Sequence, residues 1–374
     1  MSNVERLFNE FGEVAKHPGK AIKGLVDKTG KKVIGCVPLY TPKELIYAAG
    51  MLPVGVWGAE KEVSEAKRYF PAFLCSIMQT ILDEGLVGNY DILDAIIIPN
   101  YCDSLKVMGQ NFKLAVKNVK FLPLTIPQTR RIPAGKTFII SQYNVLKEQL
   151  EEIAGKKITD EALNEAIEVF NEQNKTMMEF SKLCAEYPAE INAMNRMYVY
   201  KSAYFMEVPE HTAMVKELIA EIRKEAPKAF NGHRVVTTGI IVDSANLNQI
   251  LVDLNCAVVG DDVAFESRQY RHFIPEGDSP MDRIGQQFCD RECSTLLNEK
   301  RIRGQMIIDL AKERNAEGII FFLTKFCDPE EFDYPKMKAD FEAAGVPHIM
   351  VEIDQQIRNL EQARTYIQTF TDVL

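Results

Sequence analysis

The stretch AIIIPNYCDSL, residues 95–105, joins an apolar run to a cysteine and an aspartate. The stretch IIFFLTKFCDPEEF, residues 319–332, repeats this arrangement, with Cys327 and Asp328 in the places of Cys102 and Asp103. Runs that are apolar throughout, rather than alternating, are typical of parallel strands that helices cover on both faces. The two stretches therefore predict two α/β units built alike, each of which places a cysteine at the end of a buried strand.

Six further apolar segments of this kind alternate with helical patterns along the chain. The predicted strands are 32–40, 52–58, 94–100 and 119–127 in the first half, and 233–243, 255–263, 317–326 and 347–354 in the second. Strands that alternate with helices favour parallel sheets of the doubly wound type. The predicted fold class is therefore α/β, with two Rossmann-like domains that contain parallel sheets.

Two other regions are expected to be helical. At the N-terminus, apolar residues at helical spacing predict an amphipathic helix that docks on the body of the protein. Residues 143–230 are charged and nearly free of glycine, which predicts an insert of three or four helices whose methionines either fill the core or line an acyl pocket. The predicted domains are 1–30 (N-terminal helical segment), 31–142 (first α/β domain), 143–230 (helical insert) and 231–374 (second α/β domain).

Composition excludes several classes of protein. The 374 residues carry a formal net charge of −9, which argues against nucleic acid as a partner but leaves room for a phosphorylated ligand. No apolar run approaches the length of a membrane span, and the N-terminus is charged, so we expect a cytoplasmic protein. The eight cysteines should then not form disulfides, and the lack of a CxxC motif argues against a zinc ribbon or finger.

Three cysteines are candidates for a shared site. Ligands of doubly wound sheets bind outside the carboxyl ends of the strands, where Cys102 and Cys327 are predicted. Cys75, in the first turns of the predicted helix FPAFLCSIMQ, lies where the amide dipole favours a thiolate. Three thiolates are one fewer than a structural zinc ion or an electron-transfer cluster takes, so one metal position would stay open. The alternative is that each is a buried core cysteine, the commoner role of this residue type.

The remaining cysteines carry weaker signals. Cys289 and Cys293 are four residues apart on a predicted helix and could bind a metal together. Because no histidine is near them in the sequence, they are instead predicted to be ordinary residues of the helix face. Cys36, Cys184 and Cys256 lie within apolar strands or the helical region and are predicted to be core residues.

Acidic residues near the strand ends have two interpretations. Asp103 and Asp328 either cap the helices that follow or orient backbone amides toward the cysteines. Asp261 and Asp262 end a strand and could be functional, but solvated or capping acids are the ordinary case there. The five histidines are scattered, so the sequence contains no recognisable Cys/His or Ser/His/Asp group.

Several of these segments resemble one known family. They are CVPLYTPKELIYAAGMLPVGVWG (36–58), YFPAFLCSIMQ (69–79), IIPNYCDSLK (97–106), VVGDD (258–262) and KFCDPEEFDYPKMKADFEAAGVPHIMVEID (325–354). They are similar to the 2-hydroxyacyl-CoA dehydratases, a family that also contains benzoyl-CoA reductase subunits. The resemblance covers nearly the whole chain, and its length is that of the β subunit.

The resemblance implies a cofactor and partners. Each subunit in this family holds a 4Fe–4S cluster on three cysteines, which correspond motif by motif to Cys75, Cys102 and Cys327. Family members are oxygen-sensitive heterodimers of two similar subunits in anaerobes that ferment amino acids. The resemblance therefore implies a homologous α subunit, a separate ATP-dependent iron–sulfur activator protein, and a 2-hydroxyacyl-CoA substrate.

It also implies an activity, the removal of water from (R)-2-hydroxyacyl-CoA to give (E)-2-enoyl-CoA. In the family, one electron on the thioester carbonyl gives a ketyl radical anion that expels the α-hydroxyl, and the electron is later recovered. Because the cluster of the α subunit mainly binds the substrate, the cluster of a β subunit is expected to relay or hold the electron. Tyr40, Thr41 and Glu44 follow the first strand near the expected cleft, but helix capping explains Thr41 equally well and no general base is assigned.

Other functions stay open on the sequence alone. A subunit of an ATP-coupled aryl-CoA reductase would deliver electrons into its substrate instead of recycling them. A non-catalytic scaffold subunit would hold a cluster that turnover does not need. A zinc-binding or plain CoA-binding protein would contain no iron. The acyl group, whether aliphatic, phenyllactyl or indolelactyl, is not indicated by the sequence.

Overall fold

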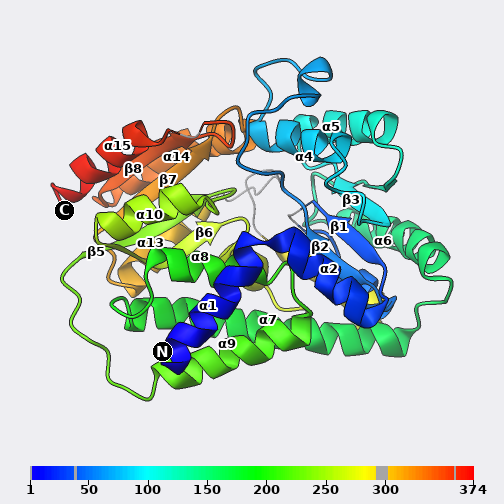
Figure 1. Ribbon diagram of the computed structural model, residues 1–374, viewed down its shortest axis with the longest axis horizontal. Coiled ribbons are helices and arrows are strands. Elements are labelled where there is room, and N and C mark those ends of the chain that lie inside the picture. The colour runs from blue at the N-terminus through cyan, green and yellow to red at the C-terminus, as the bar shows by residue number, and fades with distance from the viewer. Residues whose placement is uncertain (1, 38–39, 292–301, 358) are drawn as a thin grey trace. The chain divides into compact units, whose positions relative to one another are not determined.

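The computed structural model (Figure 1) describes residues 2–37, 40–291, 302–357 and 359–374. Contacts divide the chain into two compact units, each of which contains one parallel sheet. The first-sheet unit comprises Gly19–Glu172 and His272–Glu299, and the second-sheet unit comprises Met1–Pro18, Gln173–Arg271 and Lys300–Leu374.

The first sheet contains β1 (Val33–Cys36), β2 (Leu52–Gly55), β3 (Ala95–Pro99) and β4 (Lys120–Leu124). All four strands are parallel, in the order β2-β1-β3-β4. Its helices pack in two pairs, α3 (Lys43–Ala48) with α6 (Pro133–Ala154), and α4 (Ser76–Leu86) with α5 (Asp103–Ala115). The central strands β1 and β3 are buried along their whole length, which explains why their sequences do not alternate.

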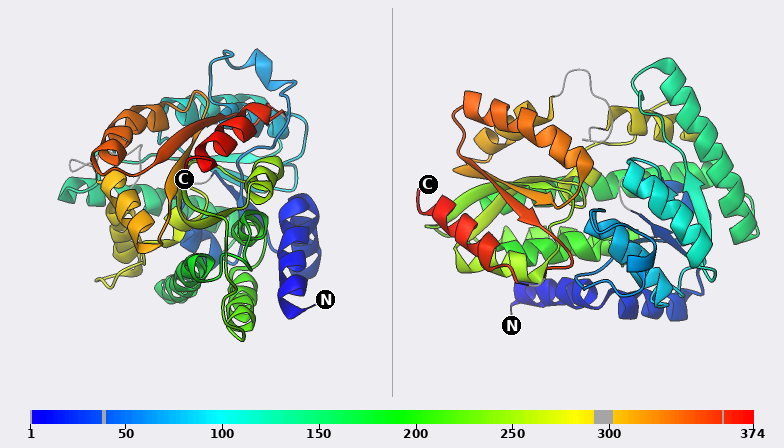
Figure 2. Two further views of the ribbon diagram at one scale, coloured as in Figure 1. Left: turned by 90° about the vertical axis from the view of Figure 1, so that its left-hand side faces the viewer. Right: turned by 90° about the horizontal axis from the view of Figure 1, so that it is seen from above.

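The second sheet has the same topology. Its strands are β5 (His233–Gly239), β6 (Cys256–Val263), β7 (Gly318–Thr324) and β8 (His348–Ile353), in the parallel order β6-β5-β7-β8. Helix α13 (Arg303–Glu313) packs with α14 (Asp328–Ala343), and α10 (Ala245–Asp253) packs with α15 (Glu361–Thr371) (Figure 2). Each of the eight predicted strands is present within its predicted segment. The α/β class with two parallel sheets is confirmed.

The region predicted as a helical insert is helical. It contains the end of α6 and three further helices, α7 (Asp160–Glu186), α8 (Ala193–Ser202) and α9 (Val208–Ile222). Two short helices, α11 (Ser267–Tyr270) and α12 (Pro280–Asp290), follow β6. Helix α7 contributes residues to both compact units, so the proposed domain boundaries stay a prediction.

The N-terminal residues form α1 (Asn3–Lys16) and α2 (Pro18–Thr29). Helix α1 packs on α8 and α9, where Leu7, Phe8 and Phe11 are buried in a hydrophobic cluster with Met177 of α7. The predicted amphipathic docking helix is confirmed, and Met177 is a core residue. No helix in the described part of the chain is long and apolar enough to cross a membrane.

Candidate functional site

Cys102 lies in the turn after β3. It is the N-cap of α5, and its Sγ accepts a hydrogen bond from the Leu105 amide at 3.4 Å. The turn is fixed to the end of β4, because the Asn100 amide donates to the Leu124 carbonyl and Asn100 Oδ1 accepts from the Ile126 amide, at 3.1 and 2.9 Å. The strand order changes direction between β1 and β3, which is where doubly wound sheets bind ligands. Cys102 therefore lies beside the switch point of the first sheet.

Cys75 is the N-cap of α4 and is 5% exposed. The sequence analysis predicted that Cys75 lies inside the first turns of the helix. In the structure the helix begins at Ser76, one residue after Cys75. As the N-cap, Cys75 lies next to the backbone amides that have no carbonyl partner within the helix. The sulfur of Cys75, like that of Cys102, therefore lies at the positive end of a helix.

The segment before Cys75 is held against α4 by one carboxylate. Asp83 Oδ1 accepts hydrogen bonds from three consecutive amides, those of Ser64, Glu65 and Ala66, at 2.7–2.9 Å. Its other oxygen lies 2.8 Å from the ammonium of Lys61. Burial alone would raise the pKa of Asp83, but Lys61 and the amides outweigh burial and hold this pKa below its usual value.

Cys327 is the N-cap of α14 in the second-sheet unit and is 9% exposed. Its amide donates to the Thr324 carbonyl, and its own carbonyl accepts from the amides of Glu330 and Glu331, each at 3.0 Å. The capping role predicted for Asp103 and Asp328 is therefore wrong, because the cysteines take the cap position. The two aspartates are the first residues of their helices, where a negative charge complements the dipole.

All three candidate cysteines thus precede a helix, and each meets a positive helix end that favours an anionic sulfur. The cysteines predicted to be core residues differ. Burial raises the pKa of Cys36, Cys184 and Cys256 to about 12, so these thiols stay neutral. Their core assignment is confirmed.

Cys289, in α12, is also buried, and burial raises its pKa to about 11. Cys293 lies outside the described residues, so neither interpretation of the Cys289 and Cys293 pair is tested.

Two bulky residues at the strand ends have left-handed backbones. Tyr40, after β1, has φ 64°, and Phe326, directly before Cys327, has φ 59°. For a residue with a side chain this conformation costs about 1–2 kcal/mol. The Tyr40 ring meets Tyr101, the neighbour of Cys102, edge-on at 5.4 Å between centroids. Such strain is common at functional sites, and the sequence gives no sign of it because neither residue is Gly or Asn.

Two buried arginines lie close to the switch point of the first sheet. Arg130 is fully buried and donates to the carbonyl of Arg291, whose guanidinium lies 5.0 Å from the centre of the Tyr40 ring. Within the described segments, Nε and Nη1 of Arg130 have no hydrogen-bond acceptor. Buried donors without an acceptor are unfavourable. The unused donors of Arg130 therefore favour an anionic or acceptor group, which the sequence analysis did not detect.

Thr41 and Glu44 are buried next to this edge. The N-cap of α3 is Pro42, and the hydroxyl of Thr41 donates instead to the Val37 carbonyl at 3.0 Å. Capping by Thr41 is therefore wrong. No side chain at this edge is assigned as a general base.

The acidic pair that ends β6 is buried. Asp261 and Asp262 are each 1% exposed, and Asp261 forms an ion pair with Arg196. Asp262 accepts hydrogen bonds from three arginines, Arg268, Arg271 and Arg303, at 2.9, 2.9 and 2.7 Å. Burial alone would raise the pKa of Asp262, but Arg268 and Arg303 hold it well below its usual range. The expectation of solvated acids is wrong, because buried arginines pair with both. Arg268 and Arg271 follow β6 within ten residues, whereas Arg196 and Arg303 come from distant parts of the sequence.

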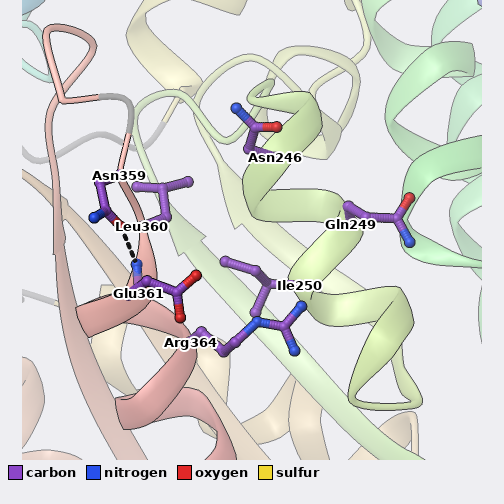
Figure 3. Close-up of a pocket in the computed structure, with 7 residues that line it drawn as sticks. All are labelled: Asn246, Gln249, Ile250, Asn359, Leu360, Glu361 and Arg364. Atoms are coloured by element: carbon purple, nitrogen blue, oxygen red, sulfur yellow. Dashed lines mark hydrogen bonds between the residues drawn. The ribbon is translucent and has the colours of Figure 1, made fainter.

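A surface cavity of about 560 Å³ lies between α10 and the start of α15 (Figure 3). None of the three candidate cysteines lines it, and Asn359 Oδ1 accepts from the Glu361 amide at its rim, at 3.0 Å. Its lining residues are Asn246, Gln249, Ile250, Asn359, Leu360, Glu361 and Arg364. Because no cysteine or histidine lines it, this cavity is not the candidate site.

Cys75 and Cys102 belong to the first-sheet unit and Cys327 to the second-sheet unit. Across residues 2–37, 40–291, 302–357 and 359–374, no group of three or more His, Cys, Asp or Glu side chains is arranged to hold a metal ion. Binding of one group by all three cysteines therefore stays a prediction.

Comparison with known proteins defines the class. A family model described as 2-hydroxyglutaryl-CoA dehydratase, D-component, matches residues 38–374. The (R)-phenyllactyl-CoA dehydratase beta subunit of Clostridium sporogenes is 56% identical over the full length of both chains. The lactoyl-CoA dehydratase subunit beta of Anaerotignum propionicum is 40% identical, again over the full length of both. A benzoyl-CoA reductase subunit of Thauera aromatica is 28% identical over 91% of this chain and 90% of its own length.

These matches indicate a subunit of a dehydratase, that is, of a hydro-lyase. The chain belongs to the 2-hydroxyglutaryl-CoA dehydratase D-component family. The family resemblance predicted from the motifs is confirmed. The dehydratase β subunits are more similar to this chain than the reductase subunit is, so the comparisons support dehydration rather than aryl-CoA reduction.

Proposed function

We propose that this chain is the β subunit of an (R)-2-hydroxyacyl-CoA dehydratase, which forms a heterodimer with a homologous α subunit and removes water to give the (E)-2-enoyl-CoA. The observation that carries the proposal is the end-to-end identity of 56% and 40% with two dehydratase β subunits. An aromatic acyl group such as phenyllactyl is the substrate class favoured by the higher of these identities. We further propose a cytoplasmic, anaerobic enzyme of amino-acid fermentation that depends on an ATP-hydrolysing iron–sulfur activator.

The proposed cofactor is a 4Fe–4S cluster with Cys75, Cys102 and Cys327 as ligands. The donor set suits it chemically, because thiolates are the usual ligands of iron–sulfur clusters and each sulfur stands at a positive helix end. The two unused donors of the buried Arg130 also suit an anionic group. When bound, the cluster would supply one-electron transfer. The chain would hold the three sulfurs, keep water away and set the local charge.

The test is an activity assay on the heterodimer, purified without oxygen and supplied with activator and ATP. We expect (R)-phenyllactyl-CoA to be dehydrated at a higher kcat/KM than (R)-lactoyl-CoA or (R)-2-hydroxyglutaryl-CoA. We also expect many turnovers for each electron delivered, since the electron is recycled. Dehydration of none of these esters would overturn the proposal, and consumption of electrons in proportion to product would indicate a reductase.

A Cys102→Ala variant of this chain distinguishes a catalytic subunit from a non-catalytic scaffold subunit. If the cluster relays the electron, the variant loses most of its dehydration activity while the heterodimer still assembles. Wild-type dehydration by a heterodimer in which this chain holds no cluster would show that the chain is a scaffold. Size-exclusion chromatography of the variant controls for assembly.

A further inference from the structure

Arg303, the first residue of α13, is a buried arginine whose donors are all used. Its Nε donates to Asp262 at 2.7 Å and its Nη2 to Thr238 at 3.0 Å. Its two Nη atoms also bind the two carboxylate oxygens of Glu330, at 2.9 and 3.0 Å. One guanidinium thus connects the ends of β5 and β6 to the first turn of α14 in a bidentate geometry that is strong and directional.

Glu330 is three residues after Cys327, at the position where a capping-box glutamate would reach back to the N-cap amide. Its side chain does not do so. The amide of Cys327 donates to the Thr324 carbonyl, and the fully buried carboxylate of Glu330 points to Arg303. The first turn of α14 is therefore fixed from outside the helix, by contact with the sheet.

The ion-pair cluster around Arg303 is balanced within the described residues. Three arginines, Arg268, Arg271 and Arg303, face three carboxylates, Asp262, Glu330 and Asp333. Burial alone would lower the pKa of Arg303, but Glu330 and Asp262 raise it well above its usual value. A cluster with matched charges does not need an external ion. We therefore consider which segment the cluster fixes. It contacts the first turn of α14, and Cys327 is the N-cap of that helix.

We infer that Arg303 and Glu330 are positioning residues that fix the sulfur of Cys327 for metal binding. The inference rests on the proposed function, because Cys327 is there a cluster ligand. The link between Cys327 and its strand is strained at Phe326 and has no side-chain cap hydrogen bond. Without the Arg303–Glu330 pair, the cap residue would lose the contact that defines its place relative to the sheet.

The experiment compares iron content among heterodimers purified without oxygen. The iron lost by Cys327→Ala defines the share that this chain binds. We expect Glu330→Gln and Arg303→Lys each to lose more than half of that share. The matched control is Glu331→Gln, which removes the same charge from the neighbouring, exposed position of the same turn and should keep all of it. Wild-type iron in Glu330→Gln overturns the inference, whereas wild-type iron in Cys327→Ala overturns the proposed ligand set.

A second measurement does not depend on the cluster. In iron-free heterodimer, alkylation of Cys327 followed by mass spectrometry should be faster in Glu330→Gln than in wild type by about fivefold or more, because the local structure opens more often. Glu331→Gln should match the wild type. A purely structural role predicts a lower Tm with unchanged iron content and unchanged Cys327 alkylation, and that result contradicts the inference. If Glu330→Gln does not fold, Glu330→Asp is measured instead, because it keeps the charge but is one methylene shorter. We expect the same loss of iron and the same faster alkylation of Cys327 in that variant.

Discussion

The candidate site is defined at the scale of single residues by three cysteines that each occupy the N-cap position of a helix. Cys102 and Cys327 follow the third strand of their sheets, as the matched motifs predicted. The cap position itself was not predictable for Cys75, because a cysteine is a rare N-cap and the nearby Pro71 suggested an earlier helix start. The buried Arg130 and the left-handed Tyr40 and Phe326 were also missed, since each depends on contacts between distant segments.

The left-handed backbone at Phe326 leads to a prediction about two substitutions of that residue. Glycine adopts a positive φ at no steric cost, whereas alanine keeps the clash of its Cβ. Phe326→Gly should therefore have a higher free energy of unfolding than Phe326→Ala, by about 1 kcal/mol. This is the reverse of the order in an ordinary helix or strand, and urea denaturation of the two variants measures it. Alanine equal to or more stable than glycine would contradict a left-handed residue before Cys327.

At the scale of secondary structure, the sequence predicted the eight strands well because the buried strands are apolar throughout. The helix starts were less predictable. Thr41 has a side chain that can cap a helix, but its hydroxyl donates to the Val37 carbonyl. Asp103 and Asp328 lie one residue after the N-cap position, which Cys102 and Cys327 occupy. Side-chain hydrogen bonds at a helix start depend on the conformation of the segment that connects the preceding strand to the helix. Hydrophobic periodicity does not encode that conformation.

The segment that precedes Cys75 should depend on Asp83 of α4. Asp83→Ala leaves three buried or half-buried amides and the Lys61 ammonium without this acceptor, which should lower the free energy of unfolding by about 3 kcal/mol. Glu152→Ala, which breaks an exposed pair with Lys120, is the control and should cost less than about 1 kcal/mol. Equal effects of the two substitutions would contradict an anchoring role for Asp83.

Asp83 should also make stability depend on pH. Because its pKa in the folded protein lies below the unfolded value, its contribution is present above the unfolded pKa, about 4. The contribution is lost as the pH falls through the folded value. The difference in Tm between wild type and Asp83→Ala should therefore shrink progressively below about pH 4. A difference that stays constant across that range would show that the carboxylate charge is not involved.

At the scale of the whole molecule, the two sheets share one strand order, with the second strand at the edge and the first beside the third. This agreement supports two units built alike, as the repeated cysteine motif suggested. The charged groups at the ends of the strands differ. The second unit has balanced charges around Asp262, whereas in the first unit two donors of the buried Arg130 have no acceptor in the described chain. Net charge and composition could not reveal that difference, because it depends on which charges are buried together.

The central claim is that sulfurs from both halves of this chain bind one iron–sulfur cluster, and iron and acid-labile sulfide analysis of the heterodimer tests it most directly. We predict that Cys75→Ala, Cys102→Ala and Cys327→Ala each lose the same share of iron and sulfide, while Cys184→Ala and Cys256→Ala, whose thiols are buried and neutral, keep the wild-type content. Full iron content in any of the first three variants would contradict the claim.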